Sequence, residues 1–487
     1  MPDFGFVGAA YQAPSIYQDD QECINFYPEI DPTKPQGSRG VVALYPTPGL
    51  VSKVQLNVAE VRGMRALSGG QYLIAVCGAS VWLIDKNFNQ TLIGQVGTSA
   101  GQIAITDNQM SGTGLTAYIV DTSGRYTYTV STGVYQQLPT TDGLWIGATH
   151  CDTVDNYIAY NEPGTQNWAV TDLGSALSTT GNYGSKDGAP DNLVALIVDH
   201  RQVFLLGEVT SEVWVDVGNV IAGITTFPFQ RVAGTTAQHG CAAPFSVSRF
   251  AESFAFVSKD TRGQAIIGFM SGYQFIRMST HAVEYSLRGV DISDAFAFTY
   301  QREGHEFYVV TFPQANLTWV FDAATQLWHK WLSFSNGQFN RHRSNCAAFF
   351  NGYNLVGDYQ NGKIYQLDNE VYTDDGATIK RVRRAVHLVT DLQRQYFEEL
   401  QIQFQPGVGL NTGQGSDPQA MLRWSNDGGS TWSSEHWTSI GKIGKYANRA
   451  IWRRLGQSRD RIFEVAVSDP VNAVIISANL KASVGEN

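Results

Sequence analysis

The most specific chemical pattern in the chain is the octapeptide from Ser425 to Trp432, which fits the spacing SxDxGxTW. The Asp427 carboxylate is placed to accept hydrogen bonds from backbone N–H groups across a tight hairpin turn, and Gly429 permits a left-handed bend. Thr431 completes the pattern, and Trp432 follows it as an aromatic ring that packs beneath the turn. The spacing is typical of an Asp-box. We therefore expect a structural turn, and no catalytic site, at these five positions.

Other patterns that suggest chemistry are weaker. Residues 97–101 (GTSAG) fit the nucleophile pattern GxSxG, but the next residues alternate like a strand where that elbow requires a helix. The pairs His150-Cys151 and His239-Gly240-Cys241 offer too few ligands, too close together, for a tetrahedral metal site. No P-loop, HExxH or EF-hand pattern occurs in the sequence. We expect no catalytic residue, no metal, no cofactor and no enzymatic activity.

Arginines gather at three places, and each is a candidate interface. The clusters consist of Arg341 with Arg343, of Arg381 with Arg383 and Arg384, and of Arg453 with Arg454. On a strand, Arg381 and Arg383 would share one face and could grip a carboxylate or phosphate. The alternative for all three clusters is a solvated face or an ion pair between neighbouring repeats.

Charge and composition limit the partners. The 487 residues carry a formal net charge of −10, so a surface built for nucleic acid is not expected, although DNA could slide past it. No apolar stretch approaches the roughly 18 residues of a membrane span. The N-terminus lacks a signal-peptide pattern, and the five cysteines are scattered. We expect a soluble protein made in the cytoplasm.

Strand pairs recur along the middle of the chain. Seven aliphatic and aromatic hairpins begin near residues 72, 115, 157, 203, 253, 306 and 353. This period of roughly 40 to 55 residues is close to that of propeller blades, which bury their faces by stacking radially. The pattern predicts an all-β fold with a propeller of six to seven blades. A string of β-sandwiches is the alternative.

The flanks differ from this repeat. Residues 1–55 contain a Pro-rich stretch and predict an extended N-terminal arm that crosses the surface or a neighbouring subunit. The propeller is expected over 56–370. Residues 371–487 contain six strand-like runs and predict a separate C-terminal sheet or sandwich. The Gly-rich segment at 407–418 is expected to be a mobile loop of unassigned role.

Several segments, taken in order, resemble the packaged-DNA stabilisation proteins of short-tailed bacteriophages, the tail hub or nozzle component. The matching stretches are Asn25-Phe26-Tyr27-Pro28-Glu29, Pro48-Gly49-Leu50, Arg62-Gly63-Met64, and the runs at 167–173, 211–218 and 238–258. The C-terminal RWSNDGG and the final RIFEVAVSDPVNAVIISANL are also similar. The segment around 407–418 has no counterpart in that family.

The resemblance implies a virion protein that is assembled in the host cytoplasm. It implies a ring, usually a homohexamer, beneath the portal and its adaptor, where it extends the channel, retains packaged DNA and lets the DNA pass on ejection without sequence-specific binding. Tail needle or tail fibre proteins would be further partners. Within this interpretation Asn25, Tyr27 and Pro28 are candidate contacts between the arm and a neighbour.

Two other functions remain open at this point. A glycan-binding or sialidase-like propeller of a phage tail is suggested by the Asp-box and by the 11 tryptophans. A receptor-binding fibre would need a long shaft sequence, which the chain lacks.

Overall fold

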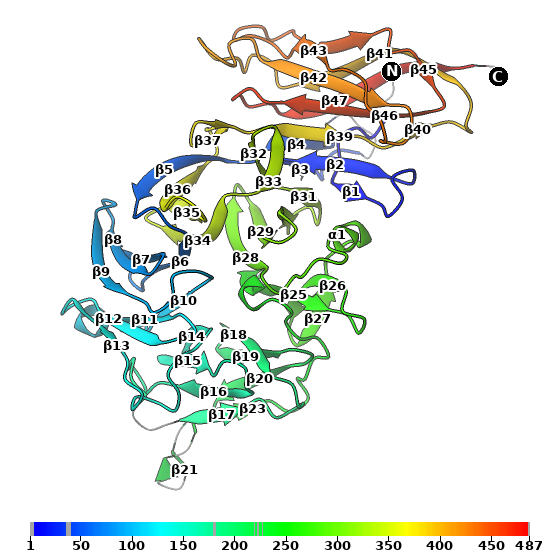
Figure 1. Ribbon diagram of the computed structural model, residues 1–487. Helices are drawn as coiled ribbons and strands as arrows, with labels where there is room; N and C mark the ends of the chain where they lie inside the picture. The colour runs from blue at the N-terminus through cyan, green and yellow to red at the C-terminus, as the bar shows by residue number, and fades with distance from the viewer. Residues whose placement is uncertain are drawn as a thin grey trace.

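The computed structural model describes residues 4–35, 40–178, 182–218, 220–221, 224–225 and 227–485. These residues are almost entirely strands and turns, with one short α-helix, α1 (His281–Ser286). Figure 1 shows radially arranged sheets below and a layered sandwich above. The all-β prediction is confirmed, and so are a propeller and a C-terminal sandwich.

Seven antiparallel blades form the propeller, and six of them follow one another along the chain. The first three are β6 (Val61–Ala66), β7 (Tyr72–Cys77), β8 (Ser80–Asp85) and β9 (Gln90–Gln95); β10 (Ala104–Asp107), β11 (Thr116–Val120), β12 (Arg125–Thr129) and β13 (Val134–Gln137); and β14 (Cys151–Val154), β15 (Tyr157–Asn161), β16 (Asn167–Val170) and β17 (Tyr183–Ser185). The next three are β18 (Leu193–Asp199), β19 (Gln202–Gly207), β20 (Ser211–Asp216) and β23 (Phe229–Arg231); β24 (Ser248–Phe250), β25 (Ser253–Lys259), β26 (Ala265–Ser271) and β27 (Gln274–Arg277); and β28 (Phe296–Arg302), β29 (His305–Phe312), β30 (Leu317–Asp322) and β31 (Trp328–Lys330). Short hairpins, β21 (Val220–Ile221) with β22 (Ile224–Thr225) and β32 (Leu332–Ser335) with β33 (Gln338–Arg341), connect some of these strands.

The seventh blade closes the ring with a strand from the other end of the propeller sequence. Three of its strands are β34 (Ser344–Phe350), β35 (Tyr353–Asp358) and β36 (Lys363–Asp368). The fourth is β5 (Gly49–Gln55), which pairs antiparallel with β36 and places Leu50 opposite Leu367. Closure of this kind removes the open gap that would otherwise lie between the first and last blades. The strand β5 lies within the expected arm, so the propeller in the structure begins before residue 56.

The sandwich also uses strands from the N-terminal segment. One of its sheets runs through β2 (Asp20–Ile24), β39 (Arg381–Arg384), β46 (Asp460–Val467), β42 (Gln419–Ser425) and β43 (His436–Ser439), with β1 (Tyr11–Gln12) and β40 (Leu388–Val389) beside it. The other contains β3 (Phe26–Ile30), β4 (Val42–Pro46), β47 (Ile475–Val484), β41 (Gln395–Phe404), β44 (Ala450–Arg453) and β45 (Gln457–Ser458). A small hairpin, β37 (Thr373–Asp374) with β38 (Ala377–Thr378), precedes β39 and pairs with β5.

The structure therefore corrects the picture of an arm that crosses the surface. The strand β2 pairs with β31 of the sixth blade on one side and with β39 of the sandwich on the other. The sixth blade and one sheet of the sandwich are thereby joined into a single 11-stranded sheet. The Pro-rich composition of this segment did not indicate strands, and β2 and β4 have partners that lie hundreds of residues away.

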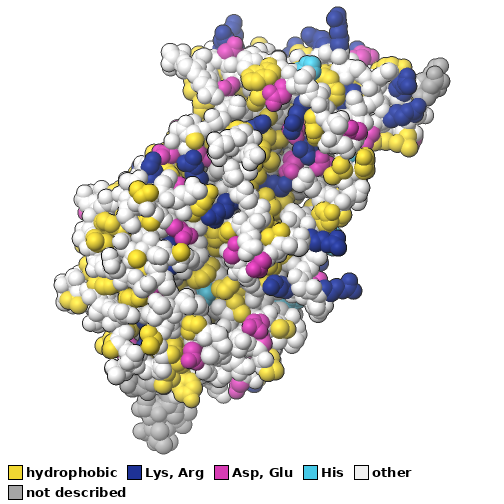
Figure 2. All heavy atoms as spheres, viewed as in Figure 1, with side chains coloured by type: hydrophobic (Ala, Val, Ile, Leu, Met, Phe, Trp, Pro, Cys, Tyr) yellow, Lys and Arg dark blue, Asp and Glu magenta, His cyan; other side chains and the backbone are white. Residues whose placement is uncertain are grey.

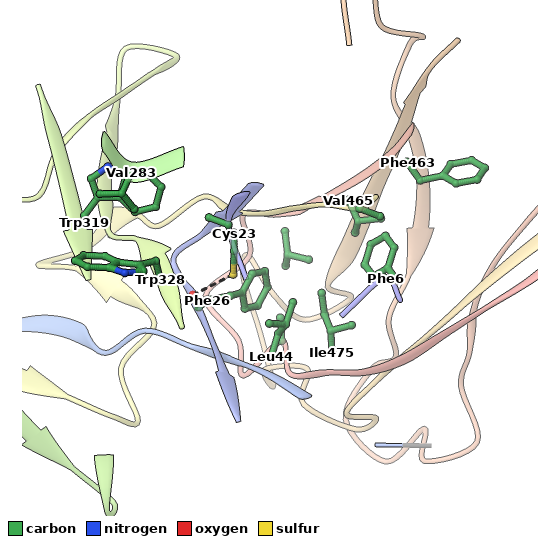
Figure 3. Close-up of a cluster of buried hydrophobic side chains, with 14 of the residues drawn as sticks. Phe6, Cys23, Phe26, Leu44, Val283, Trp319, Trp328, Phe463, Val465 and Ile475 are labelled. Atoms are coloured by element: carbon green, nitrogen blue, oxygen red, sulfur yellow. Dashed lines mark hydrogen bonds between the residues drawn. The ribbon is translucent and has the colours of Figure 1, made fainter. Parts of the chain in front are cut away.

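The largest cluster of buried side chains follows the same route. It contains Phe6, Cys23 and Phe26 from the N-terminal segment, Trp319 and Trp328 from the sixth blade, and sandwich residues of which Figure 3 labels Phe463, Val465 and Ile475. In Figure 3 Cys23 and Phe26 lie between the two tryptophans and the sandwich residues, and Phe6 lies beside Val465. A dashed line marks the 3.3 Å hydrogen bond from the Cys23 thiol to the Phe26 carbonyl. One hydrophobic core thus extends across the boundary between the two domains.

Candidate functional site

The innermost strands of all seven blades surround a central channel. A cavity of about 410 Å³ lies there. It is lined by one or more side chains from each blade, among them Arg65, Ile105, Asp152, Ile197, Arg249, Phe298 and Ala347. Arg249 donates a 2.8 Å hydrogen bond to Asp152, which joins the fifth blade to the third across the channel wall. A cavity of this volume has the size of a small-molecule pocket.

The segment that fits GxSxG lies beside the start of the second blade. Buried Arg62 of β6 donates to the carbonyl oxygens of Thr98, Ala100 and Gly101, so this loop is fixed against the first blade. The loop leads into strand β10, and no helix follows it. A nucleophile elbow is therefore absent from residues 97–101, as the alternating sequence predicted.

The two blades approach closely at this point. A Cβ added to Gly63 of β6 would lie 2.7 Å from the carbonyl oxygen of Ile103. Glycine is required there because any side chain would force the first two blades apart. The Arg62-Gly63 pair of the sequence thus serves the contact between blades.

The segment Asn25 to Pro28, which carries the family resemblance, forms the junction of the two domains. The Asn25 side chain is fully buried, and its amide nitrogen donates to the carbonyls of Leu332 and Lys380, each at 2.8 Å. Its amide oxygen accepts the backbone N–H of Leu332 at 2.8 Å. One side chain thus connects the N-terminal segment, the exit of the sixth blade and the entry to the sandwich.

Tyr27 and Pro28 are buried as well, so their contacts are intramolecular. The Tyr27 ring meets the rings of His305 and Phe307 edge to face, with centroids 5.4 Å apart in both pairs. His305 bridges two carboxylates, Asp322 at 2.8 Å on its own blade and Glu29 of β3. The hydrogen bond to Asp322, with help from Glu29, raises the pKa of His305 in spite of its partial burial. The N-terminal segment is thus tied to the sixth blade by charge as well as by packing.

The cluster at 381–384 lies inside the same junction. Arg383 is buried and donates to the carbonyls of Phe6, Ala9 and Glu22, and burial lowers its pKa to about 10. Arg384 forms ion pairs with Asp20 at 2.5 Å and with Glu464 at 2.9 Å. Both guanidinium groups therefore hold the N-terminal segment, and neither is presented to an external anion.

Arg381 belongs to a second buried group with Arg343. Burial raises the pKa of Asp374 to about 7, against the opposing effects of the Arg343 and Arg381 guanidinium groups. Burial also lowers the pKa of Arg381 to about 10. Two arginines from clusters 38 residues apart thus face one carboxyl group at the boundary of blade and sandwich.

The remaining basic residues are divided between the propeller and the sandwich. The Arg341 guanidinium stacks over the Tyr359 ring at 3.8 Å, and burial lowers its pKa. Arg453 is exposed and forms an ion pair with Glu399 at 2.7 Å. Arg454 is exposed next to it, with a positive φ of 57°. Of the predicted basic candidates, only Arg453 and Arg454 are exposed.

The Asp-box forms the turn between β42 and β43. Asp427 accepts hydrogen bonds from the backbone N–H of Thr431 at 2.8 Å and from its hydroxyl at 2.6 Å, and these bonds lower the pKa of Asp427 to about 2. Ser425 donates to Asp427, and the Trp432 indole donates to the Gly429 carbonyl. Each predicted member of the motif has a structural contact. The turn lies in the sandwich, outside the blades.

The Trp432 ring also contacts two arginines. The guanidinium groups of Arg384 and Arg423 lie 4.8 and 4.7 Å from its centroid, and both side chains pair with Glu464. The sequence did not predict this cation–π contact, because its members are up to 48 residues apart.

The two His–Cys pairs considered as metal ligands lie among packing contacts in the structure. The His150 ring stacks on Phe245 with centroids 4.8 Å apart, and burial lowers its pKa to about 4. Cys151 and Cys241 are buried free thiols. Over the residues that the structure describes, no group of three or more His, Cys, Asp or Glu side chains is placed to hold a metal. Over the same residues, no helix is long and apolar enough to cross a membrane.

Comparison with known proteins agrees with both domains. Residues 18–372 match the family described as Bacteriophage P22 Gp10, beta-propeller, and residues 380–483 match Bacteriophage P22 Gp10, beta-sandwich. The tail hub protein gp10 of Salmonella phage P22 is 21% identical over 425 residues, which cover 85% of each chain. The N-terminal domain of Nup159 is 9% identical with a TM-score of 0.40, and the match covers 71% of this chain and 98% of that one.

These matches cover propeller and sandwich in the same order as they occur here. The role that follows is structural and non-enzymatic, in the tail of a phage particle. The chain belongs to the Bacteriophage P22 Gp10 family.

Proposed function

We propose that this protein is a tail nozzle subunit that forms a ring, a homohexamer, below the portal and its adaptor. In this role the ring extends the channel, retains the packaged DNA and lets it pass on ejection. The observation that carries the proposal is the match to a tail hub protein over 85% of both chains, through propeller and sandwich alike. Ring assembly takes place in the host cytoplasm, and tail needle or tail fibre proteins bind the ring afterwards.

The restrained junction between the two domains supports the proposal that the subunit bears mechanical load. The shared 11-stranded sheet, the Asn25 hydrogen bonds and the continuous core restrain movement between propeller and sandwich. Inter-domain contacts within a chain otherwise permit relative motion by default. A subunit that does not bend at its centre transmits force from the head to the tail tip.

The channel of a single propeller is too small for a DNA duplex, which supports passage of DNA through the opening that several subunits enclose. A cavity of about 410 Å³ suits a small molecule, and a nucleic-acid duplex is far larger. The DNA conduit of the proposed ring is therefore the opening enclosed by several copies. Residues 1–379 contain 34 Asp and Glu against 20 Lys and Arg, and this negative charge would keep DNA from adhering to such a wall.

The test combines the purified protein with a portal–adaptor complex. We expect native mass spectrometry to give six copies per complex, and electron microscopy to show a ring that continues the adaptor channel. Monomers alone, both free and in the presence of portal–adaptor complex, would refute the ring. A ring that leaves packaged DNA as prone to leakage as particles without the protein would refute the retaining role.

A further inference from the structure

One end of the sandwich presents two loops that pack on each other. They follow β41 (residues 405–418) and β43 (residues 440–449), and they lie together because Gln419 of β42 pairs with Ser439 of β43. A Cβ added to Gly407 would lie 2.6 Å from the Tyr446 ring. The Ile440 N–H donates to the Pro418 carbonyl, and Ser439 donates to Asp417. The segment 407–418, to which the sequence assigned no role, is thus braced by the second loop.

The tip of this pair exposes apolar and basic side chains together. Leu410 is 40% exposed, Ile443 54% and Tyr446 73%. Among them lie three exposed basic residues, Lys442, Lys445 and Arg449. We call these six residues the loop-pair patch.

The charges of the patch are only partly balanced within the chain. Lys442 lies 3.5 Å from Asp417, which is the one ion pair that the described part of the chain makes with these three cations. Asp469 lies at the same end, but its carboxylate accepts the backbone N–H of Gln419. An apolar tip beside Lys445 and Arg449, two cations without an ion pair among the described residues, fits an acidic surface with an apolar centre.

The chain itself carries a surface of the opposite charge. Residues 47–379, which contain the propeller, hold 18 Lys and Arg against 28 Asp and Glu, whereas the sandwich segments 1–46 and 380–487 together hold 16 of each. The net charge of −10 therefore lies in the propeller portion, and the loop-pair patch is a local basic site on a neutral sandwich. Figure 2 shows Lys and Arg side chains projecting from the upper part of the molecule, where the sandwich lies.

We infer that the loop-pair patch docks onto the acidic propeller portion of a second copy of this chain. The inference rests on the proposed ring and names a contact that holds it together. A head-to-tail contact between the basic loop-pair patch of one copy and the acidic propeller of the next is heterologous, so each copy has one patch and one receiving surface. Rings close through contacts of this kind when the rotation between copies permits closure.

The test reverses charge at the patch and at a matched site. The double variant Lys445→Glu with Arg449→Glu is compared with Arg394→Glu with Arg459→Glu, which makes the same change at exposed residues elsewhere on the sandwich. A third variant, Tyr446→Ser, removes the most exposed ring of the patch while leaving the charge unchanged. Self-association is measured by analytical ultracentrifugation at two salt concentrations, with and without portal–adaptor complex.

We expect at least a tenfold weaker self-association for the patch double variant and for Tyr446→Ser, and wild-type association for the control pair. The wild type should also associate less at the higher salt concentration. Rings that form equally well with both patch variants would overturn the inference and leave the proposed function standing. Variants that lose only adaptor binding would assign the patch to the adaptor and overturn the second-copy assignment. A wild type that forms no ring under any condition would instead refute the proposed function.

Discussion

Replacement of Asn25 by glycine should weaken the junction between the sandwich and the propeller. The side chain makes three hydrogen bonds of 2.8 Å, and its loss leaves the carbonyls of Leu332 and Lys380 and the Leu332 N–H without partners. Each buried polar group left unsatisfied costs about 1 to 3 kcal/mol, so we expect a loss of at least about 3 kcal/mol of unfolding free energy. Glycine tolerates the φ of 58° at this position, so backbone strain does not contribute.

Two further substitutions separate the causes. Asn25→Ala should cost about 1 kcal/mol more than Asn25→Gly, since a Cβ disfavours the left-handed conformation. Asn25→Asp places an oxygen where two carbonyls need a donor. Its buried carboxyl should have a raised pKa in the folded state, so its deficit should shrink as the pH falls towards the value of about 3.9 for a free aspartate.

The assay is urea denaturation followed by tryptophan fluorescence, with hydrogen exchange to locate the loss at Leu332 and β39. Asn336→Gly is the matched control, because Asn336 also has a positive φ, of 51°, but is exposed in the β32–β33 turn. An Asn25→Gly protein within about 0.5 kcal/mol of wild type would refute the reasoning, since a change of that size is ordinary for a surface substitution.

Three other outcomes follow from the same contacts. Leu50→Ala in the closing strand should lower the free energy of unfolding by about 2 to 5 kcal/mol, because Leu50 is 1% exposed. Hydrogen exchange should accelerate first in the seventh blade, and unchanged exchange there would contradict closure by β5. Because the pKa of His305 is raised in the folded state, its protonation stabilises the fold most below pH 6.5, and this contribution should be lost as the pH rises through the folded pKa. The variant His305→Gln should abolish this pH dependence, which a pH series of urea midpoints measures. The lowered pKa of Asp427 works in the opposite direction, with stability lost as the pH falls from about 4 towards 2, and Asp427→Ala should flatten the acid limb of the same series.

The repeating hairpins were predictable because each is a local event. A strand, a turn with Gly or Asn, and a second strand lie within about 15 residues, and their recurrence gives the period of the blades. The Asp-box was equally readable, since all its hydrogen bonds join residues within 4 positions of one another.

The N-terminal segment was not predictable in this way. The strand β2 pairs with β39, which places Cys23 opposite Arg383, 360 positions later. No local sequence pattern predicts a strand partner at that distance, and the prolines at 28 and 35 favour the prediction of an extended arm. The burial of two arginines was missed for a related reason. The sequence left both an external anion and a solvated face or ion pair open for Arg381 and Arg383, whereas the structure buries Arg383 against the N-terminal segment and Arg381 beside Asp374.

The N-terminal segment also sets an order of events during synthesis. The strands β3 and β4 end by Pro46, but β4 pairs with β47, which begins at Ile475. At about 5 to 20 residues per second, these early strands wait roughly 20 to 90 seconds for their partner to emerge from the ribosome. During that interval they present unpaired edges, which are the usual route to aggregation. Because β4 is completed by β47, the sandwich cannot finish folding before residues 475–484 have been synthesised, and the yield of folded protein depends on what protects those edges while translation proceeds.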